Sequence, residues 1–112
     1  MAAPDAFVTA AYQWKEGERR VRDAPPEHRR SLERIVERVH AELRRRLGSR
    51  FVTAELVALY DQGTSWATDI ATRVAPDDPD AWDPRIVADA AFARYLREAE
   101  DYAGGRRILD DR

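Results

Sequence analysis

One apolar stripe constrains the fold of this chain more than any other feature. Residues 25–48, PPEHRRSLERIVERVHAELRRRLG, carry apolar side chains that recur at the three- and four-residue spacing of one helix face: Leu32, Ile35, Val36, Val39, Leu43 and Leu47. Two prolines suit the first turn, and Gly48 suits the end. The segment therefore predicts a long amphipathic helix whose stripe must be covered by other elements.

Two shorter helices are expected after it. Residues 52–63 predict a helix that Thr53 caps and Gly63 ends. Residues 65–75 predict a third helix, because Trp66, Ile70 and Val74 are spaced by four. This spacing predicts that Trp66 is buried.

The last helix has a strong start signal. Asp83 is the expected N-cap and Pro84 the first helical residue, after a loop over residues 75–84. The helix runs to Gly104 and Gly105. Its predicted inward positions, with Phe92 at the edge of the face, are Ile86, Val87, Ala90, Ala91, Tyr95, Leu96 and Ala99.

The N-terminal segment is open to two interpretations. Phe7, Ala11, Trp14 and Val21 fit a helix, whereas the residues around Gly17 could instead turn a short hairpin. A lone hairpin is marginal beside helices, so the helix is favoured. The prediction is an all-α, four- to five-helix compact single domain over residues 1–112, with the hairpin as the alternative at residues 8–22 and residues 103–112 as a tail that is either flexible or docked.

Composition limits the classes of protein. The 112 residues contain no cysteine, which excludes a disulfide framework and Cys-based zinc sites. No secretory signal or membrane-length apolar run is present, so a soluble cytoplasmic protein without a membrane partner is expected. The 19 basic and 21 acidic residues give a net charge of −2, which argues against a strongly basic phosphate-binding surface.

Residues 61–74, DQGTSWATDIATRV, have the outline of a helix-turn-helix. The chemistry does not fit DNA recognition well. Arg73 is the only cation on the second half, and Asp69 would be repelled by phosphate. Two packed helices joined by a tight turn are therefore the preferred interpretation, and a nucleic-acid-binding regulator is the alternative.

Arginine patches and a tail are the candidate partner-binding residues. One patch is Arg19, Arg20 and Arg22, and the second comprises Arg44, Arg45, Arg46 and Arg50. Interleaved glutamates favour a solvated helix face in both cases. The tail carries Ile108 and Leu109 beyond a double glycine. The second patch and these two residues are the candidate binding residues for an unknown protein partner.

Sites for catalysis or metals are not expected. Asp77, Asp78, Asp80 and Asp83 lack the glycine and terminal glutamate of a calcium loop. His28 and His40 miss the spacing of a helical metal pair, so His40 is interpreted as a hydrogen-bonded residue at the core edge. The sequence thus predicts a non-catalytic protein–protein interaction module without a cofactor, whose oligomeric state is not indicated.

Overall fold

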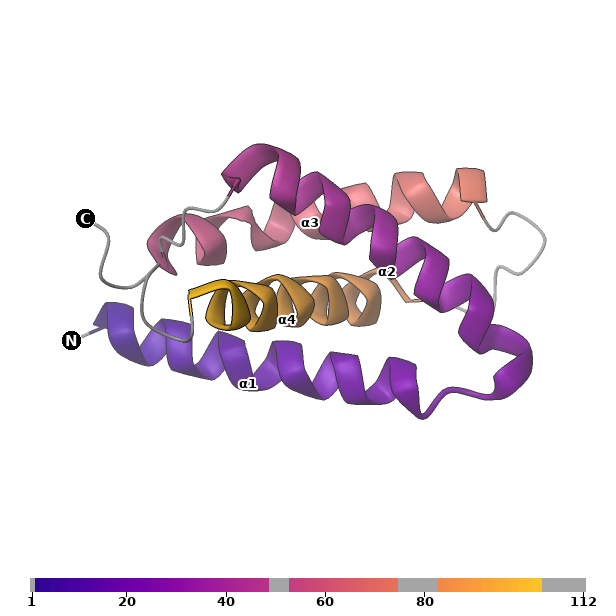
Figure 1. Ribbon diagram of the computed structural model, residues 1–112, viewed down its shortest axis with the longest axis horizontal. Helices are drawn as coiled ribbons and strands as arrows, with labels where there is room; N and C mark the ends of the chain where they lie inside the picture. Colours follow the sequence, from indigo (N-terminus) through magenta and orange to yellow (C-terminus); the bar gives the residue numbers. More distant parts are fainter. Residues whose placement is uncertain (1, 49–52, 75–82, 104–112) are drawn as a thin grey trace.

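The computed structural model describes residues 2–48, 53–74 and 83–103, and these residues form helices and no strand (Figure 1). The four helices are α1 (Ala2–Arg22), α2 (Pro26–Leu47), α3 (Thr53–Val74) and α4 (Pro84–Ala103). The all-α prediction is confirmed. The N-terminal hairpin is not formed, and the described residues contain no fifth helix.

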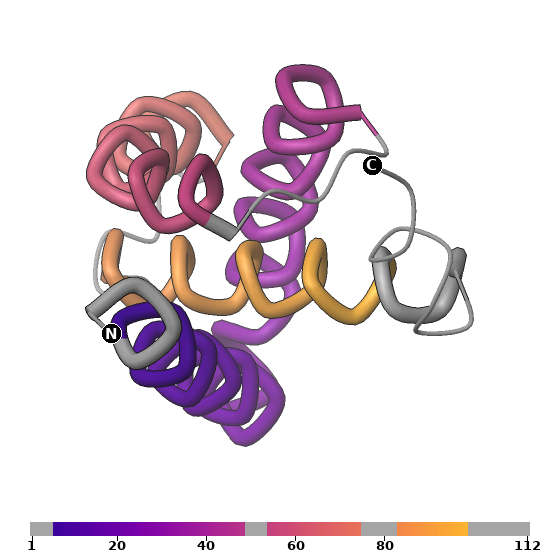
Figure 2. The backbone as a smooth tube through the Cα atoms, turned by 90° about the vertical axis from the view of Figure 1, so that its left-hand side faces the viewer, coloured from indigo at the N-terminus to yellow at the C-terminus, as the bar shows by residue number. Residues whose placement is uncertain are grey.

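α4 occupies the centre of the molecule. It lies between α1 on one side and α2 and α3 on the other, and it contacts all three (Figures 1 and 2). Its most extensive packing is against α1. A helix enclosed in this way must be apolar around its whole circumference rather than on one stripe.

The sequence of α4 meets this demand with one exception, the buried Asp89. Every residue from Val87 to Ala93 is buried, and so are Tyr95 and Leu96. The predicted edge position of Phe92 was wrong, because this side chain is fully buried. Four alanines, Ala88, Ala90, Ala91 and Ala93, keep the helix thin enough for three neighbours to approach.

Gly17 marks the closest approach of α1 to α4. A Cβ atom at this position would lie 2.3 Å from the Cβ of Asp89 and 3.2 Å from the carbonyl oxygen of Ile86. The glycine therefore provides space for a neighbouring helix and does not break α1. This is the physical reason why the hairpin alternative failed.

Gly63 has the same role in α3. A Cβ atom there would lie 2.6 Å from Cε1 of Phe92. α3 continues through this residue from Thr53 to Val74, so the prediction of two helices joined by a turn was wrong. Because α3 has no turn at Gly63, the predicted helix-turn-helix is not formed. The nucleic-acid-binding alternative was based on that motif.

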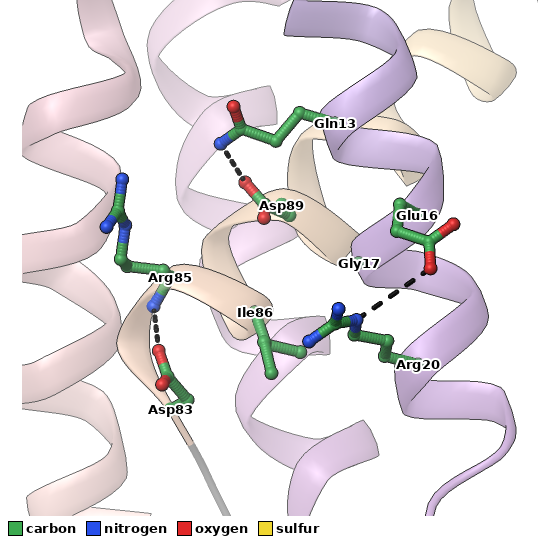
Figure 3. A pocket seen from close by; sticks show the side chains of 8 residues that line it. All are labelled: Gln13, Glu16, Gly17, Arg20, Asp83, Arg85, Ile86 and Asp89. Atoms are coloured by element: carbon green, nitrogen blue, oxygen red, sulfur yellow. Dashed lines mark hydrogen bonds and ion pairs between the residues drawn. The ribbon is translucent and has the colours of Figure 1, made fainter.

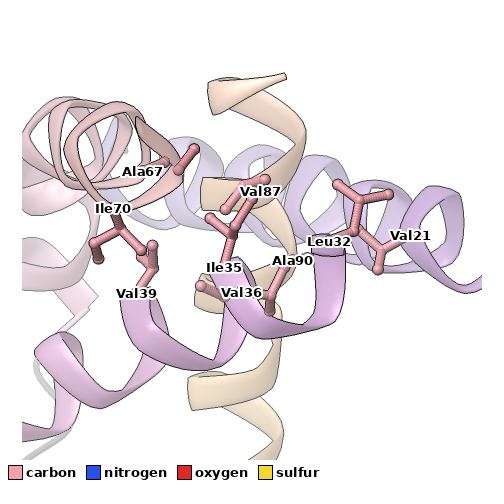
Figure 4. Close-up of a cluster of buried hydrophobic side chains, with 11 residues drawn as sticks. Val21, Leu32, Ile35, Val36, Val39, Ala67, Ile70, Val87 and Ala90 are labelled. Atoms are coloured by element: carbon pink, nitrogen blue, oxygen red, sulfur yellow. The ribbon is translucent and has the colours of Figure 1, made fainter. Parts of the chain in front are cut away.

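Two groups of buried side chains form the core. The first joins the N-terminal part of the α2 stripe, Leu32 to Val39, to the other three helices, including Val21, Ile70 and Val87 (Figure 4). The second is aromatic and places Trp14 against Phe92, with ring centroids 5.1 Å apart. The stripe predicted for α2 is confirmed in full, since all six of its residues are buried.

The start of α4 also follows the prediction. The backbone N–H of Arg85 donates to Oδ1 of Asp83 at 2.8 Å, which is an N-cap hydrogen bond. We expect Asp83→Ala to lower the free energy of unfolding by about 1 kcal/mol, because this donor loses its partner. Urea denaturation measures the change, and an unchanged midpoint would show that the cap contributes nothing.

Candidate functional site

The predicted arginine patch on α2 is occupied by partners within the chain. Nε of Arg46 and Nη2 of Arg45 lie 2.8 and 2.5 Å from Oε2 of Glu42, and Nε of Arg44 lies 3.6 Å from Oε1 of Glu98. The Glu42–Arg46 pair follows the favourable order on a helix surface. A partner's carboxylate would have to compete with these contacts. Arg50, Ile108 and Leu109 lie outside the described residues.

Trp66 is not the core residue that its spacing predicted. It is partly buried and packs against the edges of both core groups. The guanidinium carbon of Arg46 lies 4.6 Å from the centroid of its ring, so a cation lies over one face of the indole. The interior positions are taken by Ala67, Ile70 and Ala71 instead.

His40 has the role expected from the sequence. Only 9 % of the residue is exposed, and Nε2 lies 3.0 Å from Oε1 of Glu98. Burial lowers the pKa of His40, and the nearby carboxylate opposes that shift. No cluster of candidate metal ligands is present in the part of the chain that the structure describes.

A polar centre within the helix bundle was missed by sequence reasoning. Asp89 on α4 is only 8 % exposed. Its Oδ1 accepts a hydrogen bond from the hydroxyl of Tyr60 on α3, and a second from Nε2 of Gln13 on α1 at 3.1 Å. Nε2 of Gln13 also lies 3.1 Å from the Tyr60 hydroxyl. Three helices thus meet at one carboxyl group.

This centre adjoins a pocket of about 340 Å³ between α1 and the start of α4 (Figure 3). The α1 side contributes Gln13, Glu16, Gly17 and Arg20. The α4 side contributes Asp83, Arg85, Ile86 and Asp89. Nε of Arg20 lies 3.8 Å from Oε2 of Glu16, whereas Arg85 makes no ion pair with another described residue.

Burial governs the electrostatics of the polar centre. It raises the pKa of Asp89, and the hydrogen bonds from Tyr60 and Gln13 only partly oppose the shift. Burial also raises the pKa of Tyr60, and its hydrogen bond to Asp89 acts in the same direction. The hydroxyl therefore remains a donor, and Asp89 is the group that can gain or lose a proton.

Asp89→Asn tests this assignment. A native pKa above the unfolded value of 3.8 means that the folded chain binds the proton more tightly, so Asp89 destabilises the fold as pH rises through that window. Asparagine keeps an oxygen for Tyr60 and Gln13 but carries no charge. We expect the variant to gain stability relative to wild type as pH rises above the unfolded value of 3.8. Thermal melts across that range measure the difference.

The matched control for this series is Asp61→Asn, which changes an exposed carboxylate on α3. Its stability difference from wild type should vary less with pH than that of Asp89→Asn. A relative stability of Asp89→Asn that falls as pH rises would contradict the buried-carboxyl assignment.

The exposed large apolar side chains of the described residues lie one turn apart on α1. Val8 is 51 % exposed and Tyr12 is 74 % exposed. Lys15 continues the same face and has no ion-pair partner among the described residues. This exposed face could have been found from the sequence. Val8, Tyr12 and Lys15 follow one another at intervals of four and three residues, and they lie on the side of the helix opposite Trp14 and Val21.

Comparison with protein-family models, curated proteins and solved structures finds no match for this chain. Within residues 2–48, 53–74 and 83–103, no helix has the length and apolar character that crossing a membrane requires. The class of protein is therefore defined by its fold alone. It is an all-α chain built around a buried central helix.

Proposed function

We propose that this chain is a non-catalytic protein-binding module and that its binding surface is the α1 outer face, defined as Val8, Tyr12, Lys15 and Arg19. The observation that carries the proposal is the exposure of Tyr12, at 74 %, beside Val8, at 51 %. Tyrosine is enriched among the residues that dominate binding energy at protein interfaces. Covering apolar side chains that a helix leaves in water lowers the free energy and so favours binding of a partner.

The geometry of α1 supports a continuous surface. The four residues follow one another at intervals of four, three and four, so they lie along one side of the helix. Trp14, Gly17 and Val21 lie on the opposite side and pack into the core. A partner can therefore cover the α1 outer face without displacing any core contact.

Charge indicates the chemistry of the partner. Arg19 is already paired with Glu16 and with Asp23, the latter at 3.3 Å, whereas Lys15 has no such partner among the described residues. A partner segment with an apolar side chain over Tyr12 and a carboxylate opposite Lys15 would satisfy both ends. Rim charges of this kind contribute more to association rate and specificity than to affinity.

Quantitative affinity enrichment from a lysate of the source organism tests the proposal. Tagged wild type is compared with the double variant Val8→Ser, Tyr12→Ser, after nuclease treatment to remove nucleic acid. The expected result is a set of proteins whose recovery falls by about 10-fold or more with the double variant, since each of the two interface anchors contributes on the order of 1–2 kcal/mol.

The control is Arg38→Ser, which changes an exposed side chain on α2 away from the α1 outer face. It should retain wild-type recovery. Equal recovery by wild type and the double variant would reject the α1 outer face as the binding surface.

A further inference from the structure

The pocket between α1 and the start of α4 contains a buried carboxyl group that forms no direct ion pair. Asp89 lines this pocket and forms no ion pair with another described residue. A carboxylate that is 8 % exposed loses most of its hydration, and an unpaired buried charge is costly. No described cation lies within ion-pair distance of Asp89, and Arg85 acts on its charge only from farther away.

One oxygen of Asp89 remains free for a ligand. Oδ1 accepts the hydrogen bonds from both Tyr60 and Gln13. Across the described residues, no fully buried side-chain nitrogen or oxygen lacks a hydrogen-bond partner. Oδ2, for which no such bond is formed, is therefore accessible from the pocket (Figure 3).

We propose that this pocket binds the ammonium group of a small primary amine, with Oδ2 of Asp89 as its acceptor. Charge-assisted hydrogen bonds of this type are stronger than neutral ones. Tyr60 and Gln13 already hold the carboxylate in place, so its side chain loses little conformational freedom when the ligand binds.

The occupied Oδ1 selects ammonium over guanidinium. A guanidinium binds a carboxylate best through two parallel hydrogen bonds, one to each oxygen. Here Oδ1 already accepts two protein donors, so only Oδ2 is available. An ammonium is a compact charge that one oxygen can satisfy.

The remaining lining restricts the rest of the ligand. Arg20 and Arg85 approach the pocket from opposite sides of Ile86 (Figure 3). These arginines disfavour a second positive charge on the ligand, and Ile86 offers an apolar contact. A volume of about 340 Å³ is ample for a short alkyl chain. The ligand class is accordingly a small monoamine rather than a diamine.

This inference does not depend on the proposed function. The pocket uses the side of α1 that carries Gln13 and Gly17, whereas the α1 outer face carries Val8 and Tyr12. A protein partner on the α1 outer face could be lost by mutation with the pocket intact.

Amide chemical shifts of the ¹⁵N-labelled chain test the proposal during titration at neutral pH and constant ionic strength. The probes are n-butylammonium, its neutral analogue N-butylacetamide, and 1,4-diammoniobutane. We expect saturable shifts at Gly17 and Ile86 with n-butylammonium, no saturable shift with the neutral analogue, and weaker binding of the diamine. Asp89→Asn should weaken n-butylammonium binding by about 10-fold or more, whereas Asp61→Asn should not.

Three outcomes would overturn the proposal. They are non-saturable shifts with n-butylammonium, equal binding of N-butylacetamide, and wild-type affinity in Asp89→Asn. Tighter binding of the diamine would reject the monoamine class. The comparison of the two butyl probes uses the wild-type chain, so the test holds even if Asp89→Asn does not fold.

Discussion

Trp14→Ala should lower the free energy of unfolding by about 3–5 kcal/mol, the usual range for removing a large buried aromatic side chain. Trp14 is 1 % exposed and lies at the centre of the aromatic core. Its ring centroid is 5.1 Å from that of Phe92, 6.2 Å from that of Phe7 and 6.4 Å from that of Tyr60. Alanine would leave a cavity where α1, α3 and α4 meet.

Urea denaturation followed by circular dichroism measures this loss without relying on tryptophan fluorescence. Tyr12→Ala is the matched control, because it removes an exposed aromatic side chain from the same helix. We expect the control to change stability by less than about 0.5 kcal/mol. A similar small effect for Trp14→Ala would place its side chain at the surface and contradict the packing of α1.

Gly17→Ala should destabilise the fold by about 1–3 kcal/mol, even though alanine is the better helix former. At a helix position with free space, the same change would stabilise the fold by up to about 1 kcal/mol. The new methyl group would lie 2.3 Å from Cβ of Asp89 and 3.3 Å from the backbone nitrogen of Ala90. These atoms belong to the central helix, so relief requires α1 and α4 to separate.

The sign of the change decides this prediction. Thermal and urea melts of Gly17→Ala are compared with those of Thr9→Ala, which replaces an exposed residue of α1. Increased stability of Gly17→Ala would mean that α1 and α4 are not in close contact at this point.

Local sequence patterns were sufficient for the helices with clear ends and a single buried face. The stripe of α2 and the capped start of α4 both depend on side chains close in sequence, and both were predicted correctly. Gly17 and Gly63 were misinterpreted because each serves a contact with α4, a helix distant in the chain. A glycine that ends a helix and one that admits a neighbouring helix are identical in the sequence.

The polar centre could not be predicted for the same reason. Asp89 is 29 residues from Tyr60 and 76 residues from Gln13, so no spacing rule brings them together. The one available signal was an acidic residue within the apolar run Ile86–Ala93. Among the predicted binding residues, Arg44, Arg45 and Arg46 form ion pairs with Glu42 and Glu98, and their role in binding a partner stays a prediction. The exposed face of α1 was not singled out from the sequence, because the N-terminal segment was open to two interpretations, a helix or a hairpin.

Site-specific photo-crosslinking tests the central claim, that the α1 outer face binds a protein partner. A photoreactive phenylalanine analogue replaces Tyr12 in one variant and Arg38, an exposed residue of α2, in the other. Both are irradiated in cells of the source organism. We expect a discrete crosslinked protein from position 12 that is absent from position 38 and disappears when Val8→Ser is added. Equal crosslinking from both positions, or none from position 12, would contradict it.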